Sequence, residues 1–154
     1  MKPLTLYIQE KLVIKKRNNL FGYKYFPKTK EELRDIIKQR IESEGNEVDL
    51  NDIDTSKITN MSDLFNGLDF NGDISSWDVS NVTTMRYMFA YCKSFNQDIS
   101  NWDVSKVISM WGMFWGCESF NQDISNWDVS NVKHSSYVFV GCPIDKKYKP
   151  KFKD

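Results

Sequence analysis

The sequence is dominated by a 25-residue repeat, and its clearest copy, residues 95–119, reads FNQDISNWDVSKVISMWGMFWGCES. A fixed period of this length is typical of proteins in which each turn of the chain stacks on the one before. We therefore predict that equivalent residues of successive units lie over one another in columns. Three residue types recur at this spacing: Trp77, Trp102 and Trp127; Cys92, Cys117 and Cys142; and Phe89, Phe114 and Phe139.

Each unit divides into two parts with different patterns. The apolar residues of 107–117 are separated by three, three, one and three positions, which is typical of one face of a short helix. Residues 98–104, DISNWDV, have extended character. The predicted fold is an α/β solenoid of leucine-rich-repeat type, with about four coils of short parallel strand plus short helix. The expected core columns contain Ile99, Trp102, Val107, Met110, Phe114, Cys117, Phe120 and their counterparts.

Three regions follow from where the repeat begins and ends. Residues 46–142 form the repeat region, and its degenerate first copy is offset by 24 residues, because one position is missing between Leu68 and Phe70. Residues 1–45 form an N-terminal segment and a capping helix over 29–44. Thr29 and Glu32 suit a capping box at its start, and Gly45 suits its end.

The two ends of the chain leave alternatives open. Residues 4–14 have a helical stripe, which predicts either an element packed on the first coil or an address peptide read by another protein. Residues 143–154 form a basic C-terminal cap or tail. Lysines alternate there with Tyr148, Pro150 and Phe152, so this segment is either a strand covering the last coil or a free basic tail.

Composition excludes several classes of protein. Length indicates one domain. The 21 basic and 21 acidic residues give zero net charge, which by itself says nothing about nucleic acid, and we expect a protein partner and no nucleic-acid partner. Charge is nevertheless uneven: +5 over residues 1–45, −8 over 46–142 and +3 over 143–154. We see neither an apolar run of about 18 residues for a membrane span nor a signal peptide. The expected location is cytoplasmic or virion-associated.

No catalytic, cofactor-binding or metal-binding constellation is evident, so we predict that the chain is not an enzyme and needs no cofactor. His134 is the only histidine, and its equivalents in other units are polar. Two rows of aspartates, containing Asp98 and Asp103, are expected to accept backbone N–H groups in turns, with calcium binding as the alternative. The cysteine column is expected to hold buried thiols, although disulfides between neighbouring coils are a second possibility.

The motif FNQDISNWDVSNVxxMxxMFxxC resembles the BspA-type leucine-rich-repeat surface proteins, whose repeat also occurs in mycoplasma lipoproteins. The resemblance covers residues 46–142 and implies an adhesive, protein-binding role at a bacterial surface. The opening MKPLTLYIQEKLVIKK resembles short leaders on proteins of large gut bacteriophages. That second resemblance implies a virion-associated or host-directed bacteriophage protein.

Residues that break the repeat are the best candidates for function, because stacking does not dictate them. Trp111 and Trp115 are four apart and would share a helix face, with Tyr87, Tyr91 and Tyr137 one coil to either side. We predict that these five form an exposed aromatic patch that binds a protein partner of unknown identity. Self-association, as in a virion or assembly component, adhesion to a surface, and burial by the N-terminal segment are the alternatives.

Overall fold

The computed structural model describes residues 22–153 and begins with a capping helix, α2 (Lys30–Glu44). The side chain of Thr29 accepts a hydrogen bond from the N–H of Glu32 (3.2 Å), and the N–H of Gly45 donates to the carbonyl of Ile41. The helix predicted for residues 29–44 is therefore present, with the expected N-cap and end, although the carboxylate of Glu32 accepts the N–H of Lys28 instead of that of Thr29. The element predicted over residues 4–14 lies outside the described residues.

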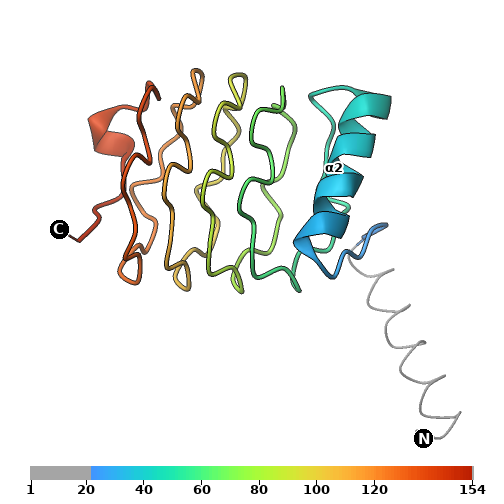
Figure 1. The fold of residues 1–154 in the computed structure, drawn as a ribbon, viewed down its shortest axis with the longest axis horizontal. Coiled ribbons are helices and arrows are strands. Elements are labelled where there is room, and N and C mark those ends of the chain that lie inside the picture. Colours follow the sequence, from blue (N-terminus) through green and yellow to red (C-terminus); the bar gives the residue numbers. More distant parts are fainter. Residues whose placement is uncertain (1–21, 154) are drawn as a thin grey trace, which may run out of the picture.

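Successive turns of the chain after α2 lie side by side, and α2 lies against the first of them (Figure 1). Parallel bridges join Asn60 to Thr84, Thr84 to Ser109, and Ser109 to His134. These offsets of 24, 25 and 25 residues match the register read from the sequence. Equivalent positions of neighbouring units therefore lie next to each other, as predicted.

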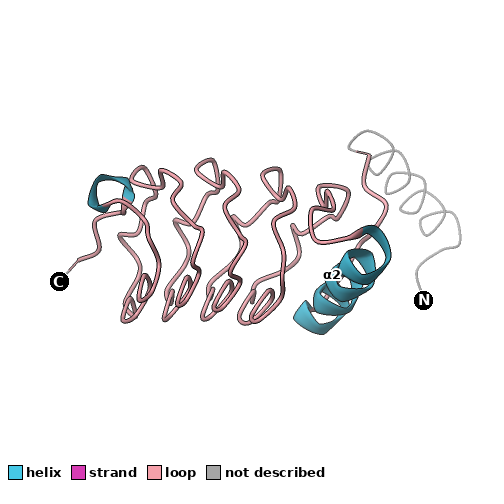
Figure 2. Cartoon of the chain, turned by 90° about the horizontal axis from the view of Figure 1, so that it is seen from above, coloured by secondary structure: helices cyan, strands magenta, loops and turns pink. Residues whose placement is uncertain are grey.

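The predicted α/β leucine-rich-repeat solenoid is wrong, because the described repeats contain neither its helices nor its strands (Figure 2). In the expected helix, the N–H groups of Met113, Trp115 and Cys117 donate to carbonyls only three residues back. The alternating N–H groups, at residues 110, 112, 114 and 116, donate instead to carbonyls 134, 136, 138 and 140 of the next unit. An α-helix needs its N–H groups for carbonyls four residues back, so contact between units replaces it with consecutive turns.

The expected strand of each unit is also a series of turns. The N–H of Trp102 donates to the carbonyl of Ile99 at 3.2 Å, which closes a turn where extended backbone was predicted. The carboxylate of Asp98 accepts the N–H of Ser100 at 2.9 Å and bends the chain just before it. Aspartate favours turns by such bonds to its own backbone. The extended character assigned to residues 98–104 was therefore misread.

The core consists of the predicted aromatic columns. Phe114 stacks between Phe89 (5.5 Å between ring centroids) and Phe139 (5.8 Å). The rings of Trp102 and Trp127 lie 6.5 Å apart and are nearly parallel, at 4°. Each of these indoles donates its N–H to a backbone carbonyl of the preceding unit, so the polar atom is satisfied within the core. Phe89 and Phe114 are fully buried, Trp102 and Trp127 are nearly so, and Phe139 in the last unit is partly buried, so the columns are the main source of stability.

The cysteine column contains free thiols, as predicted. The sulfur of Cys117 donates to the carbonyl of Cys92 at 3.1 Å, and Cys92 makes the same kind of bond to the carbonyl of Phe70. Burial raises the pKa of the Cys92 thiol to about 12 and also raises that of Cys117. These side chains act as small packed residues with a satisfied S–H group.

The C-terminal segment packs on the last unit. A short 3₁₀ helix, η1 (Lys146–Tyr148), presents the carbonyl of Tyr148 to the N–H of Ile124 at 3.0 Å. Further along, the ring of Phe152 lies 6.5 Å from that of Phe139. The segment is thus a cap rather than a free tail, but it contains a 3₁₀ turn and not the expected strand.

Candidate functional site

The turns at the edge of each unit place two residues in the left-handed backbone region. This conformation costs roughly 1–2 kcal/mol for any residue other than glycine, yet tyrosine occupies it at three of these positions. The eight positions, in order of unit, are Asp63 and Gly67, Tyr87 and Tyr91, Gly112 and Gly116, and Tyr137 and Gly141.

Glycines at 112 and 116 make room for tyrosines of the preceding unit. A Cβ atom on Gly112 would lie 2.5 Å from the ring of Tyr87, and one on Gly116 would lie 2.8 Å from the ring of Tyr91. Each tyrosine ring therefore lies directly against the backbone of the next unit. The variation between Tyr and Gly in these two rows was visible in the sequence, but the packing of each tyrosine on the glycine of the next unit was not predicted from it.

The structure brings together all five of the aromatic residues singled out from the sequence. The indole N–H of Trp111 donates to the hydroxyl of Tyr87 at 2.8 Å. The ring of Trp115 lies 6.3 Å from each of Tyr87 and Tyr91 and 5.5 Å from Tyr137, which also contacts Trp111 at 5.2 Å. We call these five residues, from three successive units, the aromatic cluster.

The aromatic cluster is partly open to solvent. Tyr91 and Tyr137 are each 51% exposed, whereas Tyr87, Trp111 and Trp115 are half-buried among their neighbours. The shared helix face that predicted their proximity does not exist. Trp111 and Trp115 instead lie on one side because each immediately precedes a left-handed glycine, so the backbone path repeats after four residues.

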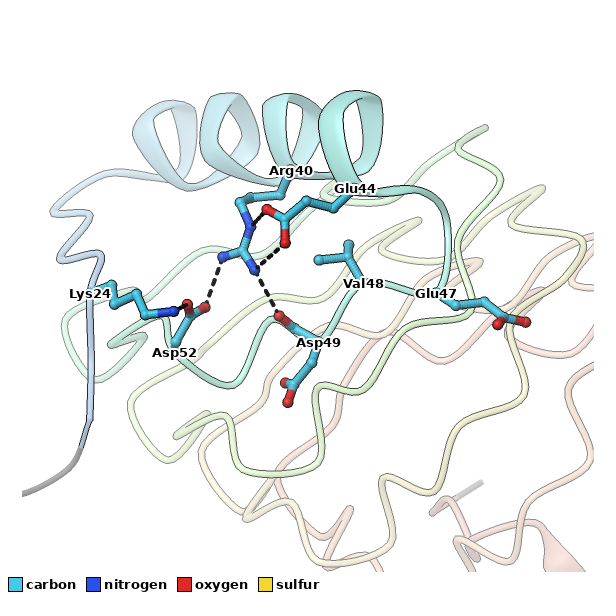
Figure 3. Close-up of a pocket in the computed structure, with 7 residues that line it drawn as sticks. All are labelled: Lys24, Arg40, Glu44, Glu47, Val48, Asp49 and Asp52. Atoms are coloured by element: carbon cyan, nitrogen blue, oxygen red, sulfur yellow. Dashed lines mark hydrogen bonds and ion pairs between the residues drawn. The ribbon is translucent and has the colours of Figure 1, made fainter.

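A second candidate is a hollow of about 390 Å³ between α2 and the first repeat (Figure 3). Arg40 spans it, donating to the carboxylates of Glu44 and Asp52 and to the carbonyl of Asp49. Lys24 pairs with Asp52 at 3.2 Å. Since the central charges already bind one another, we regard this network as a clamp that fixes α2 rather than a ligand site. The residues lining the hollow are Lys24, Arg40, Glu44, Glu47, Val48, Asp49 and Asp52.

Electrostatics support this structural role. Burial opposes ionisation of Asp52, but hydrogen bonds from Arg40 and Lys24 outweigh it and hold the pKa of Asp52 below its ordinary value. The guanidinium of Arg40 also lies 5.2 Å from the centre of the Tyr25 ring. Sequence reasoning overlooked Arg40, although its spacing of four residues from Glu44 on a helix was a usable signal.

The side chains of the two aspartate rows stabilise turns by accepting backbone N–H groups. The carboxylates of Asp98 and Asp123 accept the N–H groups of Ser100 and Ser125, at 2.9 and 3.0 Å. The neighbouring row, represented by Asp103, bonds both the N–H and the hydroxyl of the serine two residues on. Within residues 22–153, no group of three or more acidic, cysteine or histidine side chains is arranged to hold a metal ion. The turn interpretation of these rows is the one that the hydrogen bonds show.

Helix length and polarity also bear on membrane association. In the part of the chain that the structure describes, no helix is both long and apolar enough to cross a bilayer.

Comparison with known proteins identifies a family but no individual relative. No curated protein and no solved structure matches the chain. A family model described as "Mycoplasma protein of unknown function, DUF285" matches residues 32–150. The match runs from the first turn of α2, through every repeat, to the segment after η1. Because it covers well over half of the sequence, the chain belongs to the DUF285 family.

Proposed function

We propose that the chain is a non-enzymatic binding module that recognises a protein partner through the aromatic cluster. The observation that carries this proposal is the contact of five partly exposed aromatic side chains, from three successive units, beside a core whose phenylalanine and tryptophan columns are largely buried. Tryptophan and tyrosine are the residues that most often dominate the binding energy of protein interfaces.

The cluster is well ordered for binding. Trp111 is fixed by its hydrogen bond to Tyr87 and by the ring of Tyr137, so little side-chain freedom remains to be lost on association. The hydroxyl groups of Tyr91 and Tyr137 lie on half-exposed side chains and can add hydrogen bonds to apolar contact.

Backbone strain supports the same assignment. Tyr87, Tyr91 and Tyr137 have φ angles of 52°, 56° and 63°, at positions where other units have glycine. Such strain costs stability and is concentrated at functional sites in proteins. Tyrosine at such a position favours a role for its side chain, such as binding, that glycine could not fulfil.

A bacterial surface is the setting we favour for this binding. The match to a mycoplasma family adds to the resemblance of the repeat to BspA-type surface proteins, in which adhesion is the expected role. Self-association is the second candidate. Val140, which is 45% exposed and occupies the row of Trp115 one unit later, enlarges the apolar surface available to a second copy.

The decisive experiment compares three forms of the full chain in cross-linked capture from host-cell lysate. Trp111→Ala with Trp115→Ala should reduce recovery of the partner at least about tenfold, because hot-spot truncations cost 2 kcal/mol or more. Ile108→Ala is the matched control, since Ile108 is an apolar residue, 42% exposed, outside the cluster. Equal recovery from all three forms would overturn the proposal.

Folding and self-association need their own controls. If the tryptophan variant does not fold, Tyr91→Ala with Tyr137→Ala removes the two most exposed rings of the cluster with less loss of packing. Light scattering on the purified chain gives its oligomeric state. A defined oligomer that dissociates in the cluster variants would assign the surface to a second copy instead of a foreign partner.

A further inference from the structure

We call residues 60–67, 84–91, 109–116 and 134–141 the turn segments. The backbone hydrogen bonds between neighbouring turn segments all run in one direction along the stack. At the first contact, the N–H groups of residues 61, 63, 65 and 67 donate to carbonyls 84, 86, 88 and 90, at 2.8–3.0 Å. The same pattern joins residues 85–91 to 109–115 and residues 110–116 to 134–140. The N–H groups that bond to a neighbouring unit therefore point toward the C-terminal end of the stack, and the carbonyls that accept these bonds point toward α2.

Within residues 22–153, no further unit follows residues 134–141 to receive these bonds. Its equivalent donors are the backbone N–H groups of Ser135, Tyr137, Phe139 and Gly141, which we call the amide row. None of the four has an acceptor among the described residues. An edge of aligned, unpaired backbone groups is a template for pairing with another polypeptide.

The two ends of the stack are covered to different extents. At the carbonyl end, α2 buries Leu33 and Ile37 completely, and Arg34 donates to the carbonyl of Asp63. At the other end, the C-terminal segment contacts Phe139, while Tyr137 and Gly141 remain exposed. Figure 1 shows α2 lying against the first repeat, at the end of the stack where the amide row of a second copy would have to pair, so α2 stands in the way of end-to-end stacking.

Charge at the open end favours an anionic partner. Residues 143–154 carry five lysines against two acidic residues. The ammonium group of Lys149 lies 5.2 Å from the centre of the Phe139 ring, which places a cation beside the row. Unpaired N–H groups aligned in one direction add partial positive charge, and such arrangements of backbone N–H groups attract anions.

From these features we propose that the amide row binds an acidic segment of a partner polypeptide. The donors occur at every second residue, so they match alternate carbonyls of a partner segment that follows the same path of turns as a next unit would, a turn-shaped counterpart of strand addition to a sheet edge. Aspartate or glutamate side chains of that segment would face the lysines of residues 146–153. Tyr137 contributes its backbone N–H to the amide row and its side chain to the aromatic cluster, but the inference does not depend on the function of the cluster.

Poly-L-glutamate is a suitable first probe, because it combines backbone carbonyls with carboxylates. Amide NMR of the full chain with and without it should show exchange of the four amide-row protons slowed at least about tenfold. The amides of Met110, Gly112, Phe114 and Gly116 are the internal control, since they occupy the same positions one unit earlier and are already bonded. Their exchange should not change.

Two variants test separately the backbone hydrogen bonds and the charge attraction. Ser135→Pro removes one donor that has no partner within the described chain and should weaken binding several-fold. Lys149→Glu reverses the neighbouring charge and should weaken binding by roughly three- to tenfold. Lys57→Glu, an exposed lysine in the first repeat, is the matched control and should have little effect.

Three results would overturn the proposal. The first is no binding of poly-L-glutamate, and the second is binding that leaves exchange of the amide row unchanged, which would indicate attraction to the lysines alone. The third is stronger protection of the row by a single-stranded oligothymidylate, which would assign it to nucleic-acid phosphates. If Ser135→Pro does not fold, the exchange data and Lys149→Glu still decide the question.

Discussion

Interior columns and the aromatic cluster are built from the same residue types and from the same units, yet they are organised differently. In the core, Phe89, Phe114 and the partly buried Phe139 have identical positions in three units and stack within 10° of parallel. On the surface, Trp111 and Tyr137 occupy different rows and meet at 66°. Exact repetition thus produces parallel, buried stacks, and departure from it produces an irregular surface that can be specific for a partner.

Backbone conformation separates the two regions as well. None of the stacked phenylalanines has a positive φ angle, whereas three of the five cluster residues do. The columns satisfy packing and backbone geometry together, while the cluster retains local strain. We therefore expect stability to reside in the columns and binding to reside in the cluster.

The largest expected effect is on Phe114, which stacks with Phe89, Phe120 and Phe139. Phe114→Ala should lower the free energy of unfolding by about 3–5 kcal/mol, because a buried aromatic ring leaves a cavity. Tyr91→Ala, at a half-exposed position of the cluster, should cost under about 1 kcal/mol. Urea unfolding of both variants is the measurement, and equal losses would abolish the distinction between the two regions.

Gly112→Ala should have an intermediate effect. The added methyl group would meet the ring of Tyr87 and would occupy a left-handed conformation (φ 60°), for a cost of about 1–3 kcal/mol. In the background of Tyr87→Gly the ring is absent, so the same substitution should cost measurably less. A double-mutant cycle by chemical denaturation measures this coupling, and a coupling of zero would mean that the ring does not depend on the glycine.

Lowering the pH tests the turns that the aspartate side chains close in each unit, and we expect a gradual loss of the free energy of unfolding. Hydrogen bonds from Ser105 hold the pKa of Asp103 below its ordinary value, and the N–H of Ser100 does the same for Asp98. A carboxyl group with a lowered folded-state pKa stabilises the fold above its unfolded value, about 3.9, and that contribution is lost as the pH falls through the folded value.

Urea unfolding at a series of pH values should therefore show stability that is nearly constant near neutrality and falls below about pH 4. Ser105→Ala removes the hydroxyl bond to Asp103 and should make this fall shallower. A free energy of unfolding that rises on acidification, or that falls only near neutral pH, would contradict the role assigned to these aspartates.

The smallest effect is a difference in labelling rate with no change in the fold. Cys92 and Cys117 are fully buried, whereas Cys142 in the last unit is only half-buried. Burial raises the pKa of all three thiols, but access differs. Iodoacetamide should modify Cys142 faster than Cys92 and Cys117, and site-resolved mass spectrometry measures these rates. Unfolding in urea should make the three rates equal. Equal protection of all three in the native state would mean that the C-terminal end is sealed.

Much of the arrangement follows from the sequence because stacking requires register. The spacing of Trp102 and Trp127 predicts their column, and the missing residue before Phe70 predicts the offset of 24 in the first unit. The capping helix was recognisable from Thr29 and Gly45. The proximity of Trp111 and Trp115 was also foreseen, although for a reason that the structure does not support.

Local backbone conformation was not predictable in the same way. Apolar positions in 107–117 fit a helix and a pair of consecutive turns equally well, since both return to the same side after about four residues. The choice depends on where the N–H groups find acceptors, and a neighbouring unit supplies them. The clamp around Arg40 and the amide row likewise depend on contacts between segments distant in sequence.

By itself, the sequence determined which residues of successive units are equivalent, because identical side chains at a fixed period bury best when they lie over one another. The tertiary structure alone decided the path of the backbone between those residues. Each N–H group must find an acceptor, and half of those in the turn segments find it in the next unit rather than in a helix. That choice produced the surface on which the aromatic cluster lies and left the amide row open at the end of the stack.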